Sequence, residues 1–109
     1  MRTYKILDLS EESINTILDA LREMELESSM DNLFWLPIPH DMLSDEQREH
    51  EEECGPHVLS LEVDDTWISM ELLVRARNKL RCSCVHYAAP ELRNHMIDYL
   101  DSFLDDLGI

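Results

Sequence analysis

Two stretches of the chain carry apolar residues at helical spacing. Between residue 11 and about residue 27 the apolar positions recur every three or four residues, which predicts an amphipathic helix with one buried stripe. Ser10 precedes this stretch as an N-cap. Pro90 suits the first turn of a last helix, and Gly108 suits its C-terminal end. The two stripes consist of Ile14, Ile17, Leu18, Leu21 and Met24, and of Leu92, Met96, Tyr99, Leu100, Phe103 and Leu107.

Other stretches are typical of extended chain. Short polar turns separate three strand-like runs, which predict an antiparallel meander over residues 57–64, 67–76 and 81–88. Residues 4–9 form a further short extended segment. Residues 33–39 are apolar but contain two prolines, which exclude a helix and a central strand. We therefore expect that segment to be an edge strand or an extended cover.

These elements predict one α+β domain over residues 1–109. Residues 30–56 enter it as a proline-containing extended segment followed by an acidic helix, as an insertion or cover. Ser44 and Gln47 supply a capping box for that short helix, which runs to about Glu53. We expect a two-layer sandwich, in which a three- to four-stranded, largely antiparallel sheet carries both amphipathic helices on one face. The element order is β, α, extended segment with short α, β, β, β, α.

The two turns of the meander set its register. Pairing Asp64 with Trp67 and Arg77 with Arg81 gives the sheet two distinct faces. The expected core face carries Leu59, Leu61, Val63, Ile68, Met70, Leu72, Val74, Cys82, Cys84 and Ala88. The opposite face carries an apolar row across the three strands, made of Val58, Leu73 and Val85.

An apolar row on an outer face needs a cover. The chain's own residues 34–38 are one candidate, and a second molecule in a symmetric homodimer is the other. Four of the nine Lys and Arg residues lie between Arg75 and Arg81, where they can meet the acidic run Glu51–Glu53 within the chain or across an interface. The candidate interaction residues are Phe34, Trp35, Val58, Trp67, Leu73, Arg75, Val85 and Tyr87.

The formal net charge of −15 on 109 residues narrows the class of partner. Binding to nucleic acid or to an anionic membrane requires Lys and Arg, so we expect neither partner. The sequence contains no signal-peptide pattern and no stretch that would span a bilayer. The chain has three cysteines, two of which are separated by a single residue, and this pattern favours reduced thiols in the cytoplasm.

Two short motifs resemble a zinc ligand set by composition, Cys54-Gly55-Pro56-His57 and Cys82-Ser83-Cys84-Val85-His86. In the predicted register, His57 and Cys84 lie on opposite sides of a central strand, about 10 Å apart, so one ion cannot readily bind both. Cys82 and Cys84 point the same way, either as a thiophilic pair or as buried core thiols. The candidate metal ligands are Cys54, His57, Cys82, Cys84 and His86.

The sequence carries no catalytic signature. Two glycines are too few for a phosphate-binding loop or a dinucleotide fingerprint, and the acids beside Cys54 disfavour a nucleophilic thiolate. We therefore expect a non-enzymatic protein-interaction module that self-associates through the outer sheet face and acts as an adaptor, chaperone or regulator. Two alternatives stay open. One is a metal-binding or thiol-based sensor that uses Cys82 and Cys84, and the other is a DNA-mimicking inhibitor of a basic protein.

Overall fold

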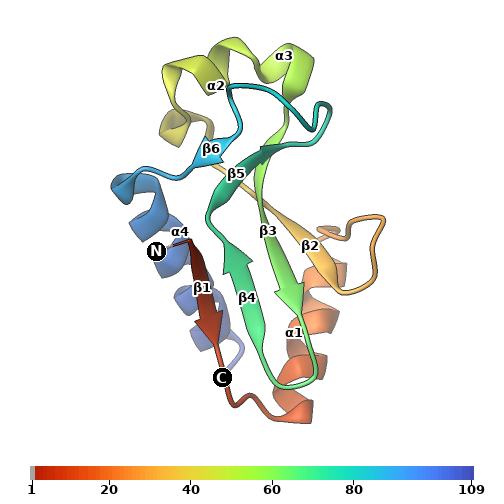
Figure 1. The fold of residues 1–109 in the computed structure, drawn as a ribbon. Coiled ribbons are helices and arrows are strands. Elements are labelled where there is room, and N and C mark those ends of the chain that lie inside the picture. Colours follow the sequence, from red (N-terminus) through yellow and green to blue (C-terminus); the bar gives the residue numbers. More distant parts are fainter. Residues whose placement is uncertain (1) are drawn as a thin grey trace.

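The protein is an α+β domain built on an antiparallel sheet. The computed structural model describes residues 2–109, which contain a six-stranded sheet and four α-helices (Figure 1). The strands are β1 (Thr3–Ile6), β2 (Leu33–Pro37), β3 (His57–Val63), β4 (Ile68–Glu71), β5 (Leu73–Ala76) and β6 (His86–Tyr87). The helices are α1 (Glu11–Glu23), the 3₁₀ turn η1 (His40–Met42), α2 (Asp45–Glu49), α3 (Glu51–Cys54) and α4 (Pro90–Asp106). The strand count exceeds the predicted three to four.

Local signals place the two long helices where the sequence predicts them. The Ser10 hydroxyl caps α1 by accepting a hydrogen bond from the backbone N–H of Ser13 at 3.1 Å. Helix α1 ends at Glu23, earlier than predicted, because Glu25 takes a left-handed φ of 59° that closes the helix. Gly108 ends α4 in the same way with a φ of 77°, as predicted.

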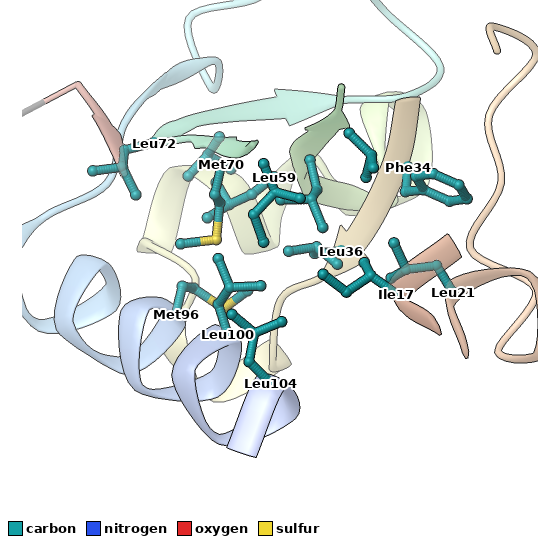
Figure 2. Close-up of a cluster of buried hydrophobic side chains, with 14 of the residues drawn as sticks. Ile17, Leu21, Phe34, Leu36, Leu59, Met70, Leu72, Met96, Leu100 and Leu104 are labelled. Carbon is teal, nitrogen blue, oxygen red and sulfur yellow. The ribbon is translucent and has the colours of Figure 1, made fainter. Parts of the chain in front are cut away.

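The core lies between the sheet and the two long helices. Residues of α1 and α4 belong to one buried cluster with the inward-facing strand residues, and Figure 2 shows the two helices on the same side of the strands. The predicted core positions from Leu59 to Val74 are buried, whereas Cys84 is buried in a second, smaller cluster with Cys54 and Ala76. Labelled core residues are Ile17, Leu21, Phe34, Leu36, Leu59, Met70, Leu72, Met96, Leu100 and Leu104.

The predicted register of the meander is confirmed at its first turn and is wrong beyond Leu72. The backbone N–H of Asp64 donates to the Trp67 carbonyl at 2.9 Å, as the sequence predicts. Leu72 then leaves the β3 ladder, because its N–H donates to Arg2 O and its carbonyl accepts from Ala88 N. Past this break the pairing is shifted by two residues, so that Val58 lies opposite Arg75 instead of Leu73.

The predicted third strand over residues 81–88 is mostly a loop. Only β6 remains of it, and Leu73 pairs with Tyr87 instead of Val85. Residues 77–85 turn away from β5, where the N–H of Asn78 donates to Cys54 O at 2.9 Å. The row of Val58, Leu73 and Val85 therefore does not form, and Figure 1 shows this loop running beside α2 and α3 at one end of the sheet.

The proline-containing segment joins the sheet and does not cover its outer face. Strand β2 pairs with β3, and Leu36 lies opposite Leu59. The acidic helix is split into α2 and α3 at His50, and the predicted capping box of Ser44 and Gln47 is present. Cover of the outer face by residues 34–38 is thus excluded.

Candidate metal centre

Four side chains of types that can bind a metal ion converge where α3 meets the loop of residues 77–85. His50 and Cys54 come from the α2–α3 segment, and Cys82 and Cys84 come from the loop. One ligand atom from each of the four lies within 4.8 Å of all the others. Two thiolates on one tetrahedral zinc ion lie about 3.8 Å apart, given Zn–S bonds of about 2.3 Å. The side chains therefore converge closely enough to surround a single ion.

The individual distances fit such a site. The sulfur atoms of Cys54 and Cys82 are 3.6 Å apart. Nδ1 of His50 lies 3.0 Å from the sulfur of Cys82 and 3.8 Å from that of Cys54. Because these separations are close to those that a tetrahedral ion imposes, only small side-chain adjustments would be needed for an ion to be bound.

Local backbone geometry explains why these residues meet. His50 and Cys54 are four residues apart on one helical turn, in which Cys54 N donates to His50 O at 2.8 Å, so both side chains project from one face. Cys82 and Cys84 flank a tight turn, closed by a bond from Val85 N to Cys82 O at 3.0 Å. A helical turn and a loop turn thus each present two ligands.

The three thiols have different proton affinities. The backbone N–H of Cys84 donates to the Cys82 sulfur at 3.5 Å, and this bond is the main cause that lowers the pKa of Cys82 to about 6. Burial is the main cause that raises the pKa values of Cys54 and Cys84. A bound cation would supply the positive charge that lets the two buried thiols ionise.

Polar contacts around the cluster hold the ligand-bearing segments together. The buried Gln47 side chain donates from Nε2 to Cys84 O at 3.1 Å, and Asn78 N donates to Cys54 O. At the surface, the Ser83 hydroxyl donates to Glu46 Oε2 at 2.6 Å. In metal sites, hydrogen bonds from surrounding residues orient the residues that bind the metal.

Two of the five predicted ligands lie outside this cluster. His57 is only 4% exposed at the start of β3, and neither of its ring nitrogens has a hydrogen-bond partner. Its pKa is lowered, mainly by burial. His86 lies on β6, where its Nε2 is 3.3 Å from Gln47 Nε2 and 3.5 Å from Ser44 Oγ.

His50 takes the place of these two histidines, and the sequence prediction missed it. The His-x-x-x-Cys spacing of His50 and Cys54 was the available signal, because residues four apart share one face of a helix. The predicted separation of His57 from Cys84 was derived with Cys84 in a strand, whereas Cys84 lies in the loop. His57 nevertheless lies outside the cluster that contains Cys84.

The predicted interaction residues divide into several environments. Phe34 and Val58 are buried, at 2% and 4% exposure, and offer no surface to a partner. Trp35, Arg75 and Val85 line a groove of about 660 Å³. The set also contains Leu73, which pairs with Tyr87 between β5 and β6. The side-chain nitrogen of Lys5 lies over the ring of Trp67, 4.5 Å from its centroid. The guanidinium of Arg2 lies over the ring of Tyr87, 4.7 Å from its centroid.

Comparisons with known proteins add no assignment. No protein family, curated protein or solved structure shows significant similarity to the chain. Among the described residues, no helix combines the length and the apolar character needed to cross a membrane.

Proposed function

We propose that this protein is a non-enzymatic zinc-binding protein, in which His50, Cys54, Cys82 and Cys84 hold one Zn²⁺ ion. The observation that carries the proposal is the convergence of these four ligand atoms within 4.8 Å. Four protein ligands complete a tetrahedron and leave no open position for a substrate, as in structural zinc sites. The ion would therefore serve structure and recognition.

The donor set favours zinc over other common cations. Three sulfurs and one imidazole nitrogen are soft or borderline ligands, which suit Zn²⁺. Ca²⁺ and Mg²⁺ prefer oxygen ligands, and the cluster offers none. Cu(I) also prefers thiolates, so copper is the competitor to test beside zinc. Reduced thiols persist in the cytoplasm, and we place the protein there.

Zinc would hold in place a part of the chain that belongs to no helix or strand. Residues 77–85 form no strand or helix, and they follow directly after β5. Their attachment to the α2–α3 segment includes the bonds from Asn78 N to Cys54 O and from Gln47 to Cys84 O. An ion shared by Cys54 and Cys82 would join the same two segments by metal–ligand bonds, whose free energy would add to that of folding.

Metal binding is tested directly on purified protein. The untagged chain is prepared without chelators, and its native mass is measured together with the visible absorption that Co²⁺ acquires in a tetrahedral thiolate site. We expect one metal ion per chain. Replacing a ligand in His50→Gln or Cys82→Ser should abolish the absorption.

His86→Gln is the matched control, because His86 was a ligand candidate by sequence and lies outside the cluster. This variant should bind Co²⁺ as the wild type does. A metal-free wild type that develops no Co²⁺ absorption would refute the proposal. Loss of binding in His86→Gln with retention in His50→Gln would show that the ligand set is wrong.

The outer sheet face supports a second function, that of a protein-interaction surface. In a two-layer arrangement with α1 and α4 on the core face, the opposite face stays open. Ser60, Glu62, Ser69 and Glu71 of that face line the groove together with Trp35. A groove of about 660 Å³ over a sheet is large enough to receive side chains of another molecule.

A further inference from the structure

The groove on the outer sheet face has one wall made by the loop of residues 77–85. Arg77, Leu80 and Val85 of this segment line the groove, and Met30 and Leu33 line it as well. Leu80 is 85% exposed and Met30 is 63% exposed, the two largest exposures among the large apolar side chains of residues 2–109. Such a pair of exposed apolar residues at the borders of one groove is typical of a surface that another molecule covers.

The loop that forms this wall carries charge opposite to that of the protein as a whole, and of its cations Arg77 lines the groove. Arg77, Lys79 and Arg81 lie within five residues, in a chain of net charge −15. The salt bridges of the described residues join other side chains, namely His40 with Glu51, Arg48 with Asp45 and Arg75 with Glu71. None of the three loop cations takes part in these salt bridges, and Arg77 also borders a hollow lined by Glu25, Glu27 and Glu51. Without a salt bridge, the loop cations can pair with carboxylates from outside the chain.

Trp35 gives this wall an apolar platform. The guanidinium of Arg77 lies over the Trp35 ring, 5.8 Å from its centroid. A guanidinium held on an aromatic ring keeps its N–H donors free for a carboxylate, which it can bind through two bonds. The ring and Leu33 offer an adjacent apolar contact, and Arg and Trp are the residue types that contribute most to binding energy at protein interfaces.

A second copy of the chain fits this surface poorly. In a symmetric dimer the same patch meets itself, so an interface centred on this wall would bring two cationic loops together. A segment with carboxylates beside an apolar residue meets both the charge and the platform. Glu62, at another part of the groove, limits the acidic part of the segment to the end where Arg77 lies.

We propose that this groove docks an acidic segment of a partner protein, with an apolar side chain against Trp35 and carboxylates against Arg77 and its neighbouring loop cations, and that bound zinc holds the loop in the docking position. The inference rests on the proposed function, because two ligands, Cys82 and Cys84, lie in the same loop as Leu80. Zinc release would leave this wall without its metal anchor.

The test is a selection from a random peptide library displayed on phage, with the zinc-loaded full chain as target. We expect enriched peptides to carry Asp or Glu next to an aliphatic or aromatic residue. A synthetic labelled copy of the most enriched peptide is then titrated by fluorescence anisotropy. Its affinity should fall about tenfold or more in Arg77→Glu and in Leu80→Ser.

Arg22→Glu is the matched control, because Arg22 is an exposed cation on α1 and does not line the groove. It should bind the peptide as the wild type does, and Co²⁺ absorption should be normal in all three variants. Removal of zinc by a chelator should lower the affinity for the peptide at least as much as Arg77→Glu does.

The outcomes separate this inference from the metal site. If the zinc-loaded protein enriches no acidic peptides, or if the affinity for the selected peptide is unchanged in Arg77→Glu, the docking inference is overturned. Neither result would contradict the metal site. Equal peptide affinity with and without zinc overturns the dependence on the metal. A zinc-loaded dimer that Leu80→Ser dissociates makes a second copy the occupant and overturns the assignment to an acidic partner.

Discussion

Gln47 and Cys84 are linked by a hydrogen bond between positions 37 residues apart, in which Gln47 Nε2 donates to Cys84 O at 3.1 Å. The same side chain accepts a bond at Oε1 from Ser44 N at 2.9 Å. Gln47 is only 1% exposed. One buried amide thus caps α2 and holds the loop that carries two of the four candidate ligands.

Replacing this amide should weaken both the fold and the metal site. In Gln47→Leu the buried carbonyl of Cys84 loses its hydrogen bond from Gln47. The free energy of unfolding of the zinc-free protein should therefore fall by about 1–3 kcal/mol. Zinc affinity should fall about 10- to 100-fold, because the loop is no longer oriented. Urea denaturation and competition with a chromophoric chelator measure the two effects.

The exposed neighbour Glu49 supplies the control. Glu49→Gln should leave both the denaturation curve and the zinc affinity at their wild-type values. If Gln47→Leu denatures like the wild type and binds zinc equally well, the amide does not position the loop.

Removal of zinc should lower the thermal stability of the protein. A ligand that binds only the folded state stabilises it by about 2.7 kcal/mol when its free concentration is 100 times its dissociation constant. A chelator should therefore lower the midpoint of thermal unfolding in the wild type and have no effect in Cys82→Ser. Ser83→Ala, which changes the residue between two ligands, should keep the chelator effect. A wild-type midpoint that does not respond to a chelator would contradict a stabilising ion.

The fold was predictable wherever neighbouring residues determine it. Ser10 and Gly108 mark the ends of helices through bonds to residues a few positions away, and the turn between Asp64 and Trp67 fixes the first register of the meander. The shift at Leu72 was not predictable in this way. It depends on backbone groups of Arg2 and Ala88, which lie far from Leu72 in the sequence.

The candidate site was half predictable. Its three cysteines were named from composition, but the alternation around Cys82 and Cys84 also fits a strand. The hydrogen bonds that hold this segment as a loop include those from Asn78 N to Cys54 O and from Gln47 Nε2 to Cys84 O, which join residues far apart in the sequence. His50 was missed because the acidic run around it reads as a solvated helix face. Its contact with the Cys82 sulfur joins positions 32 residues apart, which no local pattern encodes.

His57 should make the stability of the protein depend on pH. Burial lowers its pKa in the folded state, so below the unfolded value of about 6.5 the unfolded chain binds more protons than the folded one. This contribution to stability is complete above pH about 6.5 and declines as the pH falls below it. Urea denaturation of zinc-free protein at several pH values between about 5 and 7.5 measures the decline.

His57→Leu removes the buried imidazole together with its unpartnered ring nitrogens. It should reduce the difference in stability between pH about 5 and 7.5 but not remove it, because Cys82, whose folded pKa is lowered to about 6, also loses its contribution as the pH falls. It should leave metal binding intact. His86→Gln should keep the wild-type dependence on pH. A wild-type decline that His57→Leu does not reduce would assign the effect to other groups.

Zinc binding should strengthen as the pH rises, because each thiol must lose its proton to become a ligand. Cys82, with a pKa of about 6, is mostly ionised at neutral pH, whereas the raised pKa values of Cys54 and Cys84 keep those thiols protonated. Binding to all three sulfurs should then release about two protons near pH 7, so the apparent affinity should rise about 100-fold per pH unit there. Below pH about 6, where Cys82 is also protonated, the dependence should steepen.

Substitution separates this mechanism from a general effect of pH on the fold. Cys84→Ser removes one thiol that must deprotonate, so its weaker binding should release about one proton less near pH 7. His86→Gln keeps all three thiols and should show the wild-type slope. Competition with a chelator of known proton affinity gives the slope for each variant. A wild-type affinity that is constant between pH about 6.5 and 8 would mean that the two buried thiols do not bind the ion, because neither could ligate zinc without releasing its proton.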